Sequence, residues 1–159
     1  MSDSFGTYAL LLSISRQASM RVGALGNVSL DPGFFVYLGS AQGPGGLRAR
    51  LRHHCRTTTR PHWHLDYIRA EASVLGAWLC ASPDLLEHHW ALAIQQIRGA
   101  VIPVLGLGSS DCSCPAHLVW FARRPSVATV RRALNNISSG CTPRYVNLRR
   151  LRFFAGVAA

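Results

Sequence analysis

Two apolar segments near the N-terminus place the strongest constraint on the fold. Thr7 to Ile14 (TYALLLSI) is apolar on both faces and rich in β-favouring residues, which is typical of a central strand. Phe34 to Leu38 (FFVYL) is a second such segment, and the turn sequence Asp31-Pro32-Gly33 precedes it. We therefore expect the chain to open with two strands, with a loop or an extra short hairpin over residues 16–30 between them.

Later segments alternate between strand and helix patterns. Leu47 and Leu51 lie one helical turn apart, and Arg50 and His54 share a neighbouring polar face of the same short helix. The patterns predict strands over His62–Ile68 and Val74–Cys80, and helices over Leu47–His54, Ser82–Ile97 and Ser126–Ile137. The expected fold is α/β (α+β), a small mixed or antiparallel sheet flanked by helices, in one domain over residues 1–159.

The charge balance points to a polyanionic partner. The 159 residues hold 17 basic and 7 acidic side chains, every basic one is an arginine, and no acid follows Asp111. Arginine binds phosphate oxygens two at a time, so we expect nucleic acid rather than a membrane as the partner. No apolar run is long enough to span a membrane and no signal peptide is evident, which predicts a cytoplasmic protein that could associate with the nucleoid.

Four pieces in a fixed order resemble a known family. Gly6-Thr7-Tyr8 lies in the first strand, Tyr37-Leu38-Gly39 ends the second, Arg50 and His54 lie on the next helix, and Glu87 lies near the start of a later helix. This order resembles the GIY-YIG nuclease superfamily, over residues 6 to about 97. Leu47, Arg50 and His54 fit the spacing common in that family.

The chain also departs from the family pattern. Thr7 and Leu38 stand where the family has isoleucine, and the 16–33 segment is longer than the compact family core requires. The chain looks closest to an uncharacterised branch of the superfamily with segments like HWHLDY and DCSCPAHL. A core of about 6–97 would then be followed by a basic extension of about 118–159.

The resemblance implies a one-metal endonuclease acting on nucleic acid, DNA ahead of RNA. Tyr8 would be the base, its pKa lowered by cationic neighbours and the metal, and Tyr37 would orient water or phosphate. Arg50 would bind the scissile phosphate, and His54 would hydrogen-bond it or relay a proton. Glu87 would hold one Mg²⁺ or Mn²⁺ ion.

Six arginines outside this set are candidate phosphate contacts. Aromatic side chains are interleaved with the C-terminal ones, which suits base stacking beside backbone contacts. The candidate nucleic-acid-binding residues are Arg48, Arg52, Arg131, Arg132, Arg149 and Arg150.

Two other functions compete with the nuclease. The first is a binding module that kept this fold and recruits nucleic acid without cleaving it. The second is a zinc hydrolase centred on His62, His64 and Asp66, which would share one face of a strand over His62–Ile68.

The cysteines suggest a second kind of metal site. Five cysteines, an odd number, favour free thiols or a metal site over a disulfide framework. Cys112, Cys114 and His117 have side chains suited to structural zinc, although the sequence shows no fourth ligand. The same segment leaves open that Ser109, Ser110 or Asp111 lines the cleft.

Overall fold

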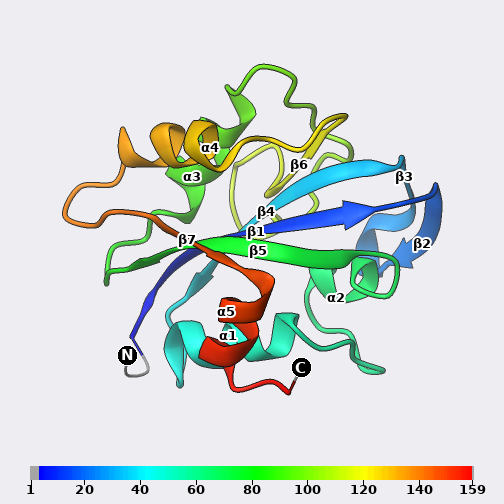
Figure 1. Ribbon diagram of the computed structural model, residues 1–159. Helices are drawn as coiled ribbons and strands as arrows, with labels where there is room; N and C mark the ends of the chain where they lie inside the picture. Colours follow the sequence, from blue (N-terminus) through cyan, green and yellow to red (C-terminus); the bar gives the residue numbers. More distant parts are fainter. Residues whose placement is uncertain (1–3, 159) are drawn as a thin grey trace.

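A five-stranded antiparallel sheet forms the centre of the fold. The computed structural model describes residues 4–158, and within that range the sheet has the order β6-β4-β1-β5-β7 (Figure 1). Every neighbouring pair is antiparallel. The strands are β1 (Gly6–Ile14), β4 (Gly33–Ala41), β5 (Ser73–Ala81), β6 (Leu118–Phe121) and β7 (Arg144–Asn147).

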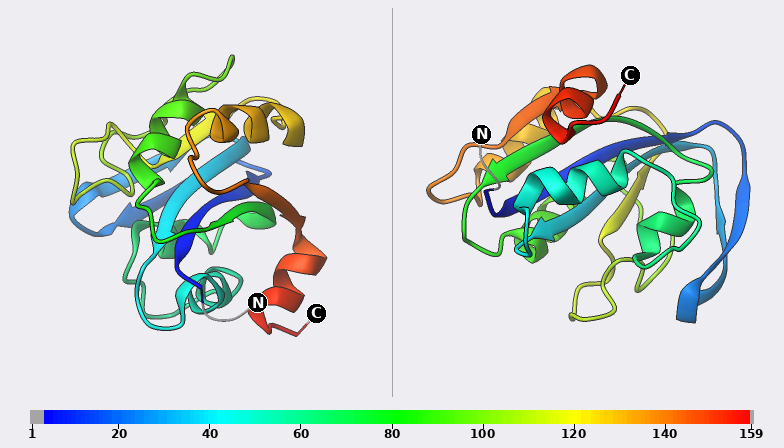
Figure 2. Two further views of the ribbon diagram at one scale, coloured as in Figure 1. Left: turned by 90° about the vertical axis from the view of Figure 1, so that its left-hand side faces the viewer. Right: turned by 90° about the horizontal axis from the view of Figure 1, so that it is seen from below.

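A separate hairpin fills the long connection between β1 and β4. It consists of β2 (Ala18–Val22), a short 3-10 helix η1 (Gly23–Leu25) and β3 (Gly26–Leu30). The hairpin extends beyond one end of the sheet (Figure 2). The expected extra hairpin over residues 16–30 is therefore confirmed.

Helices cover both faces of the sheet. Figure 1 shows α3 (Glu87–Gln95) and α4 (Val127–Asn135) on one face and the other helices on the opposite face. The second group is α1 (Gly46–His54), α2 (His64–Ile68) and α5 (Leu148–Ala155). This arrangement confirms the α+β fold with an antiparallel sheet flanked by helices.

Strand β1 is buried on both faces, as its sequence predicts. Leu10 and Leu12 pack in the core under α1 and α5, whereas Ala9 and Leu11 pack in the core under α3 and α4. The alternation follows from the two-residue period of a strand. It also sets Tyr8 on the α1 face of the sheet.

The strand predicted over His62–Ile68 is wrong, because the segment forms helix α2. Both Asp66 carboxylate oxygens accept hydrogen bonds: Oδ2 from the backbone N–H groups of His62 (2.9 Å) and Trp63 (3.0 Å), and Oδ1 from His53. An acid three residues after the N-cap satisfies N–H groups that a helix start leaves unpaired. The alternating pattern therefore belongs to a capped helix.

Helix α3 begins at Glu87, later than the Ser82-Pro83-Asp84 signal predicts. The Ser82 hydroxyl accepts a hydrogen bond from the Asp84 N–H (3.1 Å), which closes a local turn before the helix. The other predicted elements of residues 6–97 are present. Glu87 therefore lies in the first turn, where its charge favours the helix dipole.

Residues 118–158 belong to the central sheet and its cover. They supply both edge strands, β6 and β7, and helices α4 and α5, of which only α4 is predicted from the sequence. The structure also pairs Cys80 of β5 with Cys141 in a disulfide, with Cα atoms 6.0 Å apart. The preference for free thiols or a metal site over disulfides is wrong for this pair, whereas Cys55, Cys112 and Cys114 form no disulfide within residues 4–158.

Within residues 4–158, no helix is both long and apolar enough to cross a membrane.

Candidate functional site

One polar cavity gathers most of the predicted site residues. It has a volume of about 350 Å³ and is lined by residues from β1, β4, α1, α2, α3 and two loops. Tyr8, Tyr37, Arg50 and Glu87 all line it. Its full lining is Tyr8, Tyr37, Gly39, Ser40, Arg50, His62, Trp63, His64, Glu87, Gly108, Ser110 and Asp111.

The cavity lining includes two groups of residues, which we call walls. We call Arg50, His62, Trp63 and His64 the helical wall, because they lie on α1 and at the start of α2. We call Glu87, Gly108, Ser110 and Asp111 the loop wall, because three of them lie in the loop over residues 106–117. A hydrogen bond from the Gly108 N–H to His64 Nδ1 (2.8 Å) joins the two walls.

Strand register brings the two tyrosines together. Tyr8 pairs with Gly39 and Leu10 pairs with Tyr37, so both tyrosine rings lie on the same face of neighbouring strands. A Cβ atom at Gly39 would lie 2.3 Å from the Tyr8 hydroxyl. Glycine at this position is therefore what lets the Tyr8 ring lie across β4.

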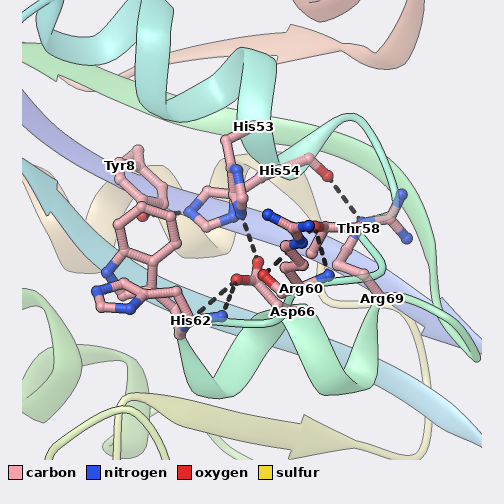
Figure 3. Close-up of polar contacts among 9 residues, drawn as sticks. Tyr8, His53, His54, Thr58, Arg60, His62, Asp66 and Arg69 are labelled. Carbon is pink, nitrogen blue, oxygen red and sulfur yellow. Dashed lines mark hydrogen bonds and ion pairs between the residues drawn. The ribbon is translucent and has the colours of Figure 1, made fainter.

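The Tyr8 hydroxyl is hydrogen-bonded to His54, which lies behind the cavity. The oxygen and His54 Nε2 are 2.7 Å apart, and both side chains are buried (Figure 3). Burial, followed by the neighbouring charges of His53 and Arg50, lowers the pKa of His54 to about 3. His54 is therefore neutral at physiological pH, and its Nδ1 has no hydrogen-bond partner.

The protein groups around Tyr8 do not by themselves lower its pKa. Burial raises this pKa well above its ordinary value, and Tyr37 and Glu87 raise it further. Arg50 lowers it, as expected, but is outweighed. Burial and then Glu87 likewise raise the pKa of Tyr37, while Arg50 opposes them.

Hydrogen bonds and aromatic contacts fix the helical wall. The Arg50 guanidinium lies over the Trp63 ring, 4.1 Å from its centroid, within the range of a cation–π interaction. His53 Nε2 lies 2.7 Å from Asp66 Oδ1, and the same carboxylate caps α2 (Figure 3). Trp63 is a site residue that sequence reasoning missed, because only the folded α1–α2 pair shows what it contacts.

The premise of a zinc hydrolase centred on His62, His64 and Asp66 is wrong. These residues lie at and just before a helix rather than along one strand face. Asp66 is occupied by three hydrogen bonds, and His64 Nδ1 accepts one from Gly108. His53, His54 and Asp66 also have ligand atoms close enough together to hold a metal ion. However, Asp66 Oδ1 is already hydrogen-bonded to His53 Nε2.

Glu87 lies between the cavity and His117. Glu87 Oε1 is 2.8 Å from His117 Nδ1, a charge-pair distance at which the N–H is not aligned for a hydrogen bond. The Glu87 side chain is 20% exposed, whereas that of His117 is fully buried. Ser110 and Asp111 also line the cavity, as the sequence left open, whereas Ser109 is buried outside it.

A cluster of two cysteines and two histidines lies behind the loop wall. His88, Cys112, Cys114 and His117, here the Cys–His cluster, each place one ligand atom within 4.8 Å of the others, a geometry that could hold a metal ion. Cys112, Cys114 and His117 were predicted as zinc ligands. The fourth member, His88, was missed because it lies 24 residues before Cys112 on an exposed face of α3.

The candidate phosphate-binding arginines lie outside the cavity lining. Arg131 and Arg132 are exposed on α4, and Arg149 and Arg150 are exposed on α5, so the pairs lie on opposite faces of the sheet (Figure 1). Arg48 and Arg52 lie on α1 beside the end of α5, where Arg52 Nε donates to the Ala155 carbonyl (2.8 Å). Arg52 therefore caps α5, a structural role.

Comparison with other proteins identifies the family to which the chain belongs. No curated protein and no solved structure matches the chain. One family model matches residues 7–139, a span that includes both walls and the Cys–His cluster. The chain therefore belongs to the family described as Domain of unknown function DUF123.

Proposed function

We propose that the chain is a metal-dependent endonuclease that hydrolyses phosphodiester bonds in nucleic acid, with DNA preferred over RNA. One observation carries the proposal: Tyr8, Tyr37, Arg50 and Glu87 come from four different elements and line one polar cavity. The resemblance to GIY-YIG nucleases predicts this set from spacing alone. The excess of arginine supports an anionic polymer as the substrate.

The oxygen donors of the loop wall fit one hard divalent cation. The carboxylates of Glu87 and Asp111 and the hydroxyl of Ser110 line the same cavity, and Mg²⁺ and Mn²⁺ favour such ligands. Glu87 would hold the ion, with Asp111 and Ser110 beside it. When bound, the ion neutralises charge on phosphate oxygens and makes a nearby water more acidic.

Tyr8 and His54 would position the attacking water. The Tyr8 hydroxyl is hydrogen-bonded to Nε2 of the neutral His54, which holds the phenol in the cavity lining, and the phenol oxygen would accept a hydrogen bond from the water. The water oxygen then bonds to phosphorus and gives its proton to solvent, while the bond to the departing oxygen breaks and that oxygen takes a proton from solvent. Because burial lowers the pKa of His54 and raises the pKa of Tyr8, neither side chain rests as an ion, and the phenol acts by hydrogen bonding.

Arg50 would bind the phosphate that is cleaved. Its guanidinium lies against the Trp63 ring, which fixes its plane toward the cavity and reduces its freedom before substrate binds. Two parallel hydrogen bonds to phosphate oxygens would place phosphorus near Tyr8. Tyr37, on the adjacent strand, would orient the phosphate or water.

The test is a cleavage assay with matched controls. Purified protein is incubated with labelled single-stranded, duplex and branched DNA and RNA, with Mg²⁺, Mn²⁺ or chelator. We expect divalent-dependent cleavage that falls by about 10²-fold or more in Tyr8→Phe and Glu87→Gln. Tyr67→Phe and Glu71→Gln, which lie outside the cavity lining, should cleave like the unaltered chain.

Binding and cleavage must be measured on the same substrates. Binding without cleavage on every substrate and with both metals would contradict the enzyme and favour the non-catalytic binding module. Equal loss of cleavage in the control variants would contradict the assigned roles of Tyr8 and Glu87. Cleavage of RNA alone would correct the preference for DNA.

A further inference from the structure

We infer that His88, Cys112, Cys114 and His117 form a structural zinc site that holds the loop wall against α3. The cluster lies behind the cavity lining and shares no residue with it. The site does not depend on the proposed nuclease activity. Only its effect on Glu87, described below, touches that proposal.

Three distances between the ligand atoms match a tetrahedral zinc site. Zinc lies about 2.0–2.1 Å from histidine nitrogen and about 2.3 Å from cysteine sulfur, so tetrahedral geometry requires about 3.3 Å between two nitrogens and about 3.6 Å between nitrogen and sulfur. His88 Nδ1 and His117 Nε2 are 3.4 Å apart. Cys112 Sγ to His117 Nε2 and Cys114 Sγ to His88 Nδ1 are each 3.5 Å.

Hydrogen bonding between the rings accounts less well for this geometry. The two histidine nitrogens, 3.4 Å apart, are more widely separated than the about 2.7–3.2 Å of an ordinary N–H···O hydrogen bond. His88 Nδ1 lies within reach of both His117 Nε2 and Cys114 Sγ, so a single ring nitrogen faces two partners at once. A central cation with four ligands accounts for all three contacts together.

The backbone of the loop holds these ligands in place. The N–H of Cys112 donates to the Ser109 carbonyl (3.2 Å), and the N–H of His117 donates to the Leu107 carbonyl (2.8 Å). The N–H of Gly106 donates to the Pro115 carbonyl (2.7 Å), which closes the loop at its base. The tight C-x-C spacing is therefore built on a fixed loop, and α3 supplies the ligand that the loop lacks.

The donor types distinguish this metal from the one proposed at Glu87. Two thiolates and two imidazoles favour zinc and disfavour Mg²⁺, which takes oxygen ligands. Four protein ligands leave no open position for substrate or water. The site is therefore structural, and its zinc differs in chemistry from the ion in the cavity.

Glu87 connects the zinc site to the cavity. Its Oε1 lies 2.8 Å from His117 Nδ1, which favours a proton on that nitrogen and leaves Nε2 free to bind metal. The Glu87 side chain also lines the cavity. The consequence for catalysis rests on the proposed function: zinc would fix the position of the carboxylate that holds the catalytic ion.

The first test is the metal content of the purified protein and of matched variants. His88 and His89 are adjacent, exposed residues on α3, and only His88 faces the cluster. We expect one zinc per chain in the unaltered protein, in His89→Ala and in Cys55→Ser. His88→Ala and Cys112→Ser should bind zinc at least about 100-fold more weakly in competition with a chromophoric chelator.

A second test covers variants that do not fold. Zinc is removed from the unaltered chain and replaced with Co²⁺, whose visible absorption reports tetrahedral geometry and whose near-ultraviolet band reports thiolate ligands. Those bands in the unaltered chain, weakened in the exposed-surface variant His88→Ala, support the site. Octahedral cobalt, no zinc or cobalt bound by the folded chain, or unchanged zinc affinity in His88→Ala would overturn it.

Glu87→Gln tests the link between the zinc site and the cavity. The variant should weaken zinc binding by about 10-fold or more, because the carboxylate beside His117 is neutralised. Unchanged zinc affinity in this variant would overturn the link between the sites. Zinc bound by a chain that cleaves nothing would support the zinc site while contradicting the nuclease.

Discussion

The helical wall and the loop wall carry comparable polar groups, but different interactions hold them. In the helical wall, Asp66 caps α2 and pairs with His53, and Trp63 supports Arg50. In the loop wall, the residues behind Ser110 and Asp111 are two cysteines and two histidines with room for a metal. The first wall can form from the chain alone, whereas the second is expected to depend on an ion.

Replacing Asp66 should disrupt the helical wall and cause the largest loss in the free energy of unfolding. Asp66→Ala removes three hydrogen bonds to a buried carboxylate, so we expect the free energy of unfolding to fall by about 3 kcal/mol in urea denaturation. Asp84→Ala, at an exposed acid, should change it little. Zinc content should stay unchanged in Asp66→Ala; its loss would mean that the two walls are not held independently.

The stabilisation that Asp66 contributes to the helical wall should depend on pH. Burial raises the pKa of Asp66, but the hydrogen bonds from His62, Trp63 and His53 lower it by more. The net effect is a pKa below its ordinary value. A carboxyl group whose pKa is lower in the folded than in the unfolded state contributes its full stabilisation of the fold at a pH above the unfolded-state pKa. This contribution is lost as the pH falls through the folded-state pKa. The difference between the unaltered chain and Asp66→Ala should therefore shrink as the pH falls below about 4.

Gly39→Ala should displace Tyr8 from its place in the cavity lining while leaving the contacts that hold the two walls intact. The added methyl group would lie 2.3 Å from the Tyr8 hydroxyl and would displace the ring from His54. We expect a loss of about 1–3 kcal/mol in thermal unfolding, with cleavage abolished. Gly43→Ala adds a methyl group with no atom within 4 Å and is the matched control. Full cleavage by Gly39→Ala would show that Tyr8 need not occupy its present position.

The smallest effect should come from the ring beneath Arg50. Trp63→Phe weakens the cation–π contact by about 0.5–1 kcal/mol, which corresponds to roughly a twofold to fivefold loss in kcat/KM on the cleaved substrate. Trp120→Phe, outside the cavity lining, should leave kcat/KM unchanged. A loss as large as that of Arg50→Ala would mean that Trp63 contacts substrate directly.

The sequence predicted the parts of the fold that depend on local pattern. β1, β4, β5 and α1 follow from apolar spacing and turn residues near the N-terminus. β6 and β7 are short edge strands with little pattern of their own, and their pairing with β4 and β5 supplies what the local sequence lacks. The strand predicted over His62–Ile68 is wrong because the Asp66 side chain accepts hydrogen bonds from the N–H groups of His62 and Trp63. These bonds stabilise a helix start despite the alternating pattern of the sequence.

The candidate site was predictable in its identities but not in its electrostatics. Tyr8, Tyr37, Arg50 and Glu87 were chosen from order and spacing, and they line one cavity. The protonation of Tyr8 and His54 depends on burial, which one sequence does not reveal. His88 could not be paired with Cys112 and Cys114 without knowing that the loop folds back onto α3.

The order of the strands has a consequence for synthesis on the ribosome. β1 is made first but lies in the middle of the sheet, and the Tyr8–His54 contact uses only residues from the first third of the chain. Glu87 and His117 emerge later, so an incomplete chain can hold the tyrosine pair without the loop that faces it. A single proteolytic cut between Ser110 and Cys112 would likewise keep Tyr8, His54 and Glu87 in one fragment and place three of the four Cys–His cluster residues in the other.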